Sequence, residues 1–216
     1  MSFAAILAVL HKPLFTVMGG SISFLEALGF ATGSLNVWLL ARQSIWNWPL
    51  GLVNNVFYLA IFASSGLYAD SGLQVVYITL SLYGWWVWLF GSTDHKALAV
   101  SKTDGQTALR LVGAGVVAMG VMYVILSRFT NSTVPFWDAL TTALSLVATY
   151  GQCRKQIESW LVWMAVDIVY VPLYVYKHLW LTAILYVGYF ALCVVGYFNW
   201  RRDVHRALPA PAAEAA

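Results

Sequence analysis

The sequence has too few charged residues for a water-soluble protein of its length. Only 10% of its 216 residues are charged, whereas 61% are hydrophobic and the mean hydropathy is +0.72. Soluble domains carry roughly 25% charged residues, which they need to cover their surface. The composition excludes a soluble globular domain and indicates one all-α integral membrane domain over residues 1–216. The net charge of +3 is too small to indicate a nucleic-acid partner.

Several signatures of catalysis are also missing from the sequence. It contains no glycine-rich phosphate loop, its four histidines are scattered, and the spacing of Cys153 and Cys193 suggests neither a metal site nor a disulfide framework. A membrane enzyme would need clustered nucleophiles, bases or metal ligands. We therefore expect no catalytic residues, no metal and no cofactor. Residues 1–18 also lack the pattern of a cleavable signal peptide.

Long apolar stretches are what the sequence has in abundance. Seven of them can cross a bilayer, which takes about 20 helical residues. They cover residues 22–41, 45–64, 69–90, 108–127, 134–153, 157–176 and 179–200. Residues 1–18 place apolar side chains at helical spacing, but His11, Lys12 and Pro13 interrupt them, which predicts an interfacial helix rather than a span.

An internal duplication relates the first three stretches to the last three. A shift of 112 positions lays residues 26–88 over residues 138–200 without a gap. It pairs Arg42 with Arg154, Ile45 with Ile157, Trp48 with Trp160, Tyr58 with Tyr170, Tyr77 with Tyr189, Gly84 with Gly196 and Trp88 with Trp200. The pattern predicts two three-helix repeats, residues 22–90 and 134–200, joined by a linker helix over residues 108–127. Three crossings leave the chain on the opposite side of the membrane, and the linker helix brings it back. Both repeats therefore start on the same side and should be parallel, with a substrate site between them.

Basic residues are divided unequally between the two ends of the predicted helices. One end carries Arg42, Lys96, Lys102, Arg110, Arg154, Lys155, Arg201, Arg202 and Arg206, and the other carries only Lys12, Arg128 and Lys177. The positive-inside rule places the first end, with the tail over residues 201–216, in the cytoplasm. Aromatic residues near this boundary, Trp85, Trp86, Trp88, Tyr197 and Trp200, are expected mainly in an aromatic belt at the membrane surface.

Polar side chains within the spans mark the candidate substrate site. Such groups are costly in lipid and usually face an interior cavity. Amides can hydrogen-bond sugar hydroxyls, and aromatic faces can stack on a flat cationic ring. Trp163, Asp167 and Tyr170 share one helical face because they are four and then three residues apart. The candidate substrate-binding residues are Asn36, Asn54, Asn55, Gln74, Trp160, Trp163, Asp167 and Tyr170.

Each of these residues also has a structural explanation. An interhelical hydrogen bond without a ligand would account for Asn54 and Gln74, and a polar lock between the repeats would account for Asp167. Core packing would explain Trp160 and Trp163.

Four further residues are gating candidates. Glu26 and Asp138 lie near helix starts, where the helix dipole favours a carboxylate whether or not it gates. Pro49 and Pro172 lie in the second helix of each repeat, where a proline is either a hinge or a static kink.

The spans also restrict the substrate. No Lys or Arg lies deep in any span. A phosphorylated solute would bring about two negative charges into the site without compensation, so we expect an unphosphorylated one. No chain of buried acids and histidines suggests a proton relay, since Asp167 is the one deep ionisable group.

Several segments resemble the PnuC family of nicotinamide riboside transporters. They are residues 26–29, 47–54, 67–68 with Gln74, 83–85 with Trp88, 135–138, and 154–155 with Glu158, Trp160 and Trp163. The resemblance extends from about Ser23 to Trp200 and implies seven helices in a 3+1+3 arrangement like that of the SWEET sugar transporters. It also implies a homotrimer in the bacterial inner membrane that carries nicotinamide riboside by facilitated diffusion. In this family a cytoplasmic kinase traps the vitamin after entry.

Other functions remain open at this point. Val166 stands opposite Asn54 and Tyr186 opposite Gln74, so the two halves are not equivalent. Members of the family carry other vitamins, including thiamin, so the alternative is a transporter of another vitamin or a sugar-like solute, with or without proton coupling. A membrane-embedded enzyme or a channel is the third class.

Overall fold

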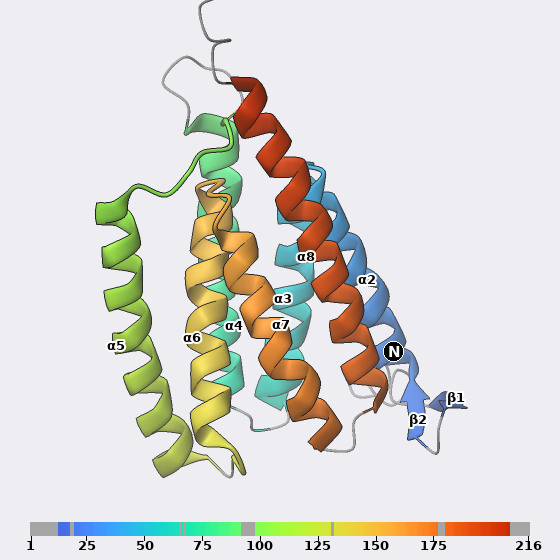
Figure 1. Ribbon diagram of the computed structural model, residues 1–216. Helices are drawn as coiled ribbons and strands as arrows, with labels where there is room; N and C mark the ends of the chain where they lie inside the picture. The colour runs from blue at the N-terminus through green and yellow to red at the C-terminus, as the bar shows by residue number, and fades with distance from the viewer. Residues whose placement is uncertain are drawn as a thin grey trace, which may run out of the picture.

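Seven helices form where the sequence predicts apolar spans (Figure 1). The computed structural model describes residues 13–17, 20–64, 66, 68–91, 98–130, 132–176 and 180–207. The helices are α2 (Phe24–Ala41), α3 (Asn47–Ser64), α4 (Tyr68–Phe90), α5 (Gly105–Phe129), α6 (Pro135–Cys153), α7 (Ser159–Tyr176) and α8 (Trp180–Ala207). The largest departure is at the C-terminal end, where α8 continues beyond residue 200 through a charged segment.

Within the described residues, four helical segments are long and apolar enough to cross a membrane by length and composition alone. They are Asp70–Phe90, Gly105–Phe129, Ser159–Tyr176 and Thr182–Arg206, and the shorter Ala27–Ala41 is also apolar. The sequence of α6 is more polar, and its buried face contains Thr141, Ser145 and Gln152 beside alanines and a glycine. Small side chains on this face let neighbouring helices approach closely.

The interfacial helix predicted over residues 1–18 is wrong for the part that the structure describes. Residues Pro13–Val17 form strand β1, which pairs antiparallel with β2 (Gly20–Ser23). Proline disfavours a helix interior, and the β-branched Thr16 and Val17 favour an extended chain. Residues 1–12 lie outside the described residues, and the described helices and strands are all helical apart from this short strand pair.

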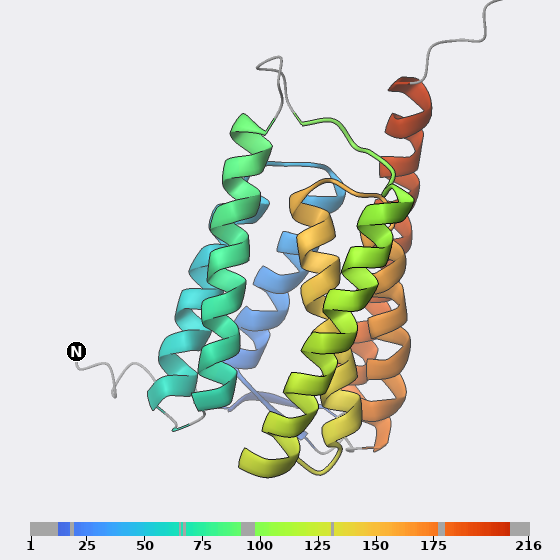
Figure 2. The same ribbon diagram turned by 90° about the vertical axis from the view of Figure 1, so that its left-hand side faces the viewer.

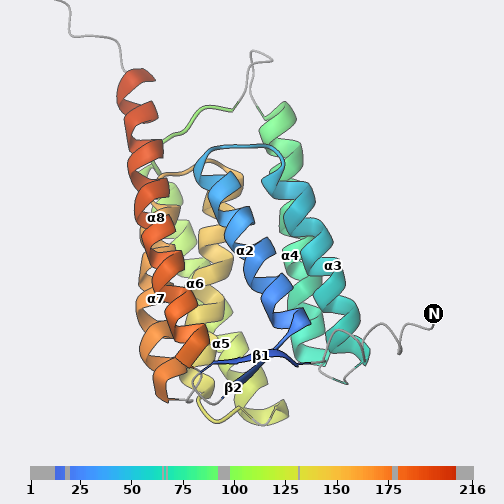
Figure 3. The same ribbon diagram turned by 90° about the vertical axis from the view of Figure 1, so that its right-hand side faces the viewer.

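Six of the helices close into a ring. Helix α2 packs on α3, α3 on α4, α4 on α6, α6 on α7, α7 on α8, and α8 again on α2. Figure 3 shows α2 between α8 and α3 at one side of the bundle. Residues far apart in the sequence, from α2 and α8, thus meet across one seam, and residues from α4 and α6 meet across the other.

Helix α5 lies outside the ring and packs along α6 (Figure 2). None of its residues is buried. Its start is fixed by Asp104, whose Oδ1 accepts a hydrogen bond from the Thr107 backbone N–H at 2.9 Å. The hydrogen bonds from Thr107 lower the pKa of the Asp104 carboxyl, as expected for a helix N-cap. A helix so little enclosed by protein has an apolar surface suited to lipid.

Helix directions alternate along the chain, so the ring neighbours α4 and α6 run parallel, as do α8 and α2. Helices α2, α4, α6 and α8 run toward one end, and α3, α5 and α7 run back (Figure 1). We call the end toward which α2, α4, α6 and α8 run the Lys155 end. It carries the α2–α3 and α6–α7 turns and the C-terminus of α8. Helices α2 and α6 therefore run in the same direction.

Candidate functional site

Four of the predicted site residues contribute a buried polar atom that has no hydrogen-bond partner among the described residues. They are Asn36 Oδ1 on α2, Gln74 Oε1 on α4, and Trp160 Nε1 and Trp163 Nε1 on α7. A buried polar atom left unpaired costs roughly 1–3 kcal/mol. The four groups come from three helices of the ring, and they supply two acceptors and two donors for a polar solute.

Asn55 and Asp167 are already paired in the structure. Asn55 Nδ2 donates to Ser81 Oγ at 3.3 Å, and the Cys193 thiol donates to Asp167 Oδ2 at 3.6 Å. Each pair joins the second helix of a three-helix group to the third helix of the same group: α3 to α4 in the first group and α7 to α8 in the second. The alternative of a polar lock between the repeats is therefore wrong for Asp167, because its partner lies in its own group.

The remaining predicted residues of the site occupy separate surroundings. Asn54 lines a pocket of about 180 Å³ between α2 and α3, together with Gly29 and Tyr58. Its counterpart Val166 is fully buried. The two groups of helices therefore differ at this level of the ring.

Tyr170 belongs to a cluster of four tyrosines on α7 and α8. Its ring centroid lies 5.4 Å from that of Tyr174 and 4.8 Å from that of Tyr186, and Tyr189 lies 5.5 Å from Tyr186. The Tyr170 hydroxyl lies near the Thr141 side chain of α6. This cluster provides aromatic faces in the half of the bundle away from the Lys155 end.

Trp160 lies in a second aromatic group, the tryptophan cluster, formed by Trp48, Trp88, Trp160 and Trp200 near the Lys155 end. Trp48 meets Trp88 edge-on at 5.4 Å, and Trp160 meets Trp200 edge-on at the same 5.4 Å. Each pair matches the other under the shift of 112 positions. Trp163 packs against this cluster, so Trp160 and Trp163 share a face as predicted.

The expected aromatic belt is wrong for two of these tryptophans. Trp88 is 6% exposed and Trp200 is fully buried, whereas Trp86 is 58% exposed and remains suited to a belt. Trp88 Nε1 also donates to the Gln152 carbonyl at 3.1 Å. The cluster closes the interior of the bundle at the Lys155 end.

Lys155 covers the tryptophan cluster. Its ammonium lies 4.3 Å from the centroid of the Trp88 ring and donates to Gln43 Oε1 at 3.0 Å. Gln43 Nε2 in turn donates to Asp203 Oδ2 at 2.6 Å. Gln43 and Lys155 have φ of 55° and 51°, in the left-handed region that ends a helix. Lys155 is only 5% exposed.

Burial lowers the pKa of Lys155 to about 8, against a smaller opposing effect of Asp203. The lysine pKa in an unfolded chain is about 10.4. The folded protein therefore releases this proton first, so its stability should rise as the pH increases from about 8 to about 10. Relative to Lys155→Met, the wild type should gain up to about 3 kcal/mol over this window. Melting curves of both proteins at several pH values would measure this; a constant difference in Tm would contradict the prediction.

The structure places three of the four gating candidates. Asp138 lies in the first turn of α6, and its Oδ2 accepts from Ser132 Oγ at 2.6 Å, which agrees with helix-end stabilisation. Pro49 lies in the first turn of α3, where a missing N–H costs no helical hydrogen bond, so it is not an interior kink. Pro172 lies inside α7. The Glu26 side chain lies outside the described part.

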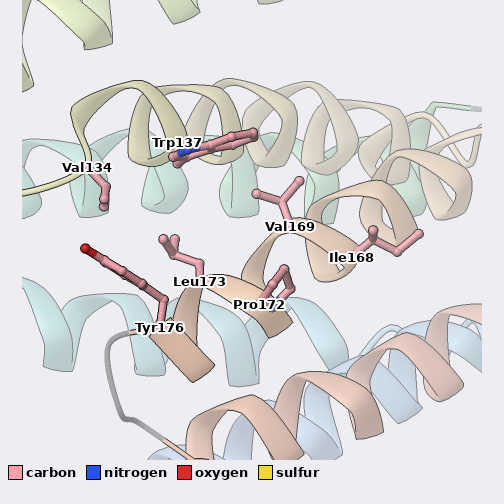
Figure 4. A pocket seen from close by; sticks show the side chains of 7 residues that line it. All are labelled: Val134, Trp137, Ile168, Val169, Pro172, Leu173 and Tyr176. Atoms are coloured by element: carbon pink, nitrogen blue, oxygen red, sulfur yellow. The ribbon is translucent and has the colours of Figure 1, made fainter.

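Pro172 borders two apolar pockets on the outer side of α7. One, of about 440 Å³, lies between α6 and α7, with Trp137, Leu173 and Tyr176 around it (Figure 4). Tyr176 is 72% exposed and Trp137 46%, so this pocket opens to the surroundings of the bundle. The other, of about 290 Å³, lies between α7 and α8 and reaches Asp167. Apolar walls open to the outside suit hydrocarbon better than a polar solute.

Gln43, Lys155, Trp88 and Trp200 were not predicted from the sequence as functional candidates. Lys155 entered only as one of the basic residues at its end of the helices. A signal was present, because the shift of 112 positions sets Gln43 opposite Lys155 and repeats both tryptophan pairs. Without the fold, nothing indicated that these residues meet.

The profile described as Nicotinamide mononucleotide transporter matches residues 23–202, nearly the whole helical region. The chain belongs to this transporter family. This match confirms the resemblance to the PnuC family. The family assignment also agrees with the prediction of a polytopic membrane protein.

Individual relatives agree with this assignment. The chain is 25% identical to the Nicotinamide riboside transporter PnuC of Escherichia coli, with 84% of this chain and 87% of the relative covered. It is 28% identical to the Riboflavin/roseoflavin transporter RibM of Streptomyces davaonensis, covering 94% of this chain and 99% of that one. The fold is similar to the crystal structure of the Vitamin B3 transporter PnuC, with a TM-score of 0.65, 25% identity and coverage of 84% and 82%.

Proposed function

We propose that this protein is a uniporter of unphosphorylated nicotinamide riboside. The observation that carries the proposal is the set of unpartnered buried polar atoms of Asn36, Gln74, Trp160 and Trp163 on three helices of the six-helix ring. Neutral amides and aromatic faces suit a solute made of a pyridinium ring, an amide and a ribose. Asn54, Asn55, Asp167 and Tyr170 are the further proposed members of the site and its surroundings.

The proposed framework consists of two parallel three-helix repeats, residues 22–90 and 134–200, in a SWEET-like 3+1+3 arrangement with α5 as the linker. The matched pairs Trp48–Trp88 and Trp160–Trp200 support it, as do Asn55–Ser81 and Asp167–Cys193, which are also 112 positions apart. Such parallel repeats place a substrate near the mid-plane between them.

In the proposed orientation the Lys155 end and the C-terminus face the cytoplasm of a bacterium. The excess of Lys and Arg at this end supports that orientation in the inner membrane. Uniport needs only alternating access to one site, so the concentration gradient sets the direction. Phosphorylation in the cytoplasm would then trap the vitamin. A homotrimer is the proposed assembly, on the resemblance to the family alone.

Riboflavin is the second candidate substrate. The similarity to the transporter RibM, which extends over 99% of that relative, favours it. A neutral flavin also avoids bringing a cation close to the buried ammonium of Lys155.

A panel of radiolabelled solutes would decide between these candidates. Purified protein in proteoliposomes should take up nicotinamide riboside with saturation and reject its mononucleotide, thiamin and glucose. Uptake of riboflavin in place of the riboside would assign the protein to the second candidate. Equal uptake of the riboside and the mononucleotide would overturn the argument from phosphate charge, and flux without saturation would indicate a channel.

Gln74→Leu should weaken riboside binding about tenfold, the effect of losing one hydrogen bond worth about 1.4 kcal/mol. The Tm of the substrate-free protein should stay unchanged or rise, because the variant removes a buried acceptor that lacks a partner. Calorimetric titration and melting curves measure the two effects. The control is Gln106→Leu, which removes an exposed amide on α5. A lower Tm with unchanged affinity would show that Gln74 is structural.

A further inference from the structure

If the two repeats are parallel, the contact between Gln43 and Lys155 has a defined place relative to the axis that relates them. The two residues are 112 positions apart and so occupy equivalent places in the repeats. Around a two-fold axis, equivalent residues can touch only close to the axis. The Gln43–Lys155 hydrogen bond therefore lies on the axis between the repeats. Trp88 and Trp200, also equivalent, approach each other to 6.3 Å and lie on it as well.

A solute that leaves the interior along this axis must pass these four side chains. Trp88 and Trp200 are buried, and Lys155 lies on the face of Trp88. The Gln43–Lys155 contact closes the gap between the α2–α3 and α6–α7 turns. No other hydrogen bond between these two turns occurs among the described residues.

The α6–α7 turn and the α2–α3 turn differ in the hydrogen bonds that hold them to the rest of the protein. The segment over residues 98–104, which we call the strap, binds the α6–α7 turn at Lys155 and at the residues that follow it. Ser101 N–H donates to the Lys155 carbonyl at 3.0 Å, and Ile157 N–H donates to the Ser101 carbonyl at 3.0 Å. Thr103 adds hydrogen bonds from its N–H and its hydroxyl to Glu158 Oε2, at 2.9 and 2.7 Å.

The α2–α3 turn has no comparable strap among the described residues. Its side-chain hydrogen bonds to the rest of the described protein are those of Gln43, to Lys155 and to Asp203 on α8. Ile45 adds apolar packing against the core that contains the tryptophan cluster. Arg42 stacks only on Trp38 of its own helix, and Trp46 is 69% exposed. The α2–α3 turn is therefore the one with fewer contacts to break.

We propose that Lys155 is a gating residue for transport, and that the passage opens at this end when the α2–α3 turn moves Gln43 away from Lys155 while the strap holds the α6–α7 turn. This inference rests on the proposed transport function. The ammonium has three donors but one hydrogen bond among the described residues, so water reaching it on opening completes its solvation. The charge of Lys155 thus favours the open state, whereas its apolar methylene stem contributes packing to the closed state.

Cross-linking tests the direction of movement. In a Cys153→Ser, Cys193→Ser background, the pair Gln43→Cys with Asp203→Cys is bridged by a short bis-methanethiosulfonate reagent. This pair ties the α2–α3 turn to α8 and leaves Lys155 in place. Bridging should lower riboside uptake at least tenfold, and reduction should restore it. The matched control is Thr103→Cys with Glu158→Cys, which also touch at this end but lie on the strap side. Its bridging should change uptake less than twofold. Equal effects of the two bridges would overturn the proposal.

A second measurement needs no substrate. Cys153 is fully buried in the tryptophan cluster, two residues before Lys155, so a reagent reaches it only when the cluster parts. In a Cys193→Ser background, a membrane-impermeant maleimide added on the C-terminal side should label Cys153 at least tenfold more slowly in Lys155→Met than in the parent. Lys102→Met, which removes an exposed charge at the same end, should label like the parent.

The two measurements separate the two proposals. Equal or faster labelling of Lys155→Met would overturn the role of Lys155 whatever the substrate is. Slower labelling of that variant together with no riboside uptake by the wild type would support the gate and reject the proposed substrate.

Discussion

Trp200→Ala should destabilise the protein by about 3–5 kcal/mol, the range for removing a fully buried tryptophan side chain. Trp200 is fully buried, packs edge-on against Trp160 and lies 6.3 Å from Trp88. Its removal leaves a cavity where the two groups of helices meet, and the surrounding rings cannot all move in to fill it. Thermal or denaturant unfolding in detergent, followed by near-ultraviolet circular dichroism, measures the loss.

The control for this prediction is Trp86→Ala. Trp86 lies two residues before Trp88, but it is 58% exposed and belongs to the outer surface of α4. We expect its replacement to cost less than about 1 kcal/mol. Equal losses for Trp86→Ala and Trp200→Ala would show that the tryptophan cluster does not stabilise this end of the bundle.

Gly84→Ala should cost about 3 kcal/mol, at the upper limit for overpacking a well-packed interior. A methyl group at Gly84 would overlap the ring of Trp48 at three of its carbon atoms. Trp48 cannot turn away easily, because Trp88 packs edge-on against it. Gly196 faces Trp160 in the same way, so Gly196→Ala should behave alike. The Tm of each purified variant measures the effect.

Gly113→Ala is the matched control in another helix. A methyl group at Gly113 on α5 would meet no atom within 4 Å. There alanine should be neutral or stabilising by up to about 1 kcal/mol, because it is the better helix former. If Gly84→Ala and Gly113→Ala changed Tm alike, the close contact between Gly84 and Trp48 would be refuted. A partial recovery of Gly84→Ala by Trp48→Phe would confirm that ring size is the cause.

The helices could be predicted from the sequence because their signal is local. A run of about 20 apolar residues forms a helix in lipid to satisfy its own backbone, so the bounds of α2 to α7 depart little from the predicted spans. The N-terminal strand pair could not be predicted in this way. Apolar residues at helical spacing pointed to a helix, but strand β1 depends on pairing with β2.

The candidate site could be predicted only in part. Polar residues in apolar spans identified Asn36 and Gln74, and the aromatic lining identified Trp160 and Trp163; buried atoms of all four lack partners among the described residues. The same rule selected Asp167, but the sequence could not tell that Cys193 would be its partner. A polar residue in an apolar span indicates that it needs a hydrogen-bond partner, whereas the identity of that partner depends on which helices are neighbours.

The sequence by itself determined that the chain is a helical membrane protein, which three-helix segments resemble each other, and the transporter family. These properties follow from composition, from local hydropathy and from residues in register. Only the tertiary structure decided that Trp86 faces outward while Trp88 is buried, and that Gln43 and Lys155 meet above the tryptophan cluster. The physical reason is that burial and contact depend on the order of the helices around the ring, which brings α2 to α8 and α4 to α6 across large separations in sequence.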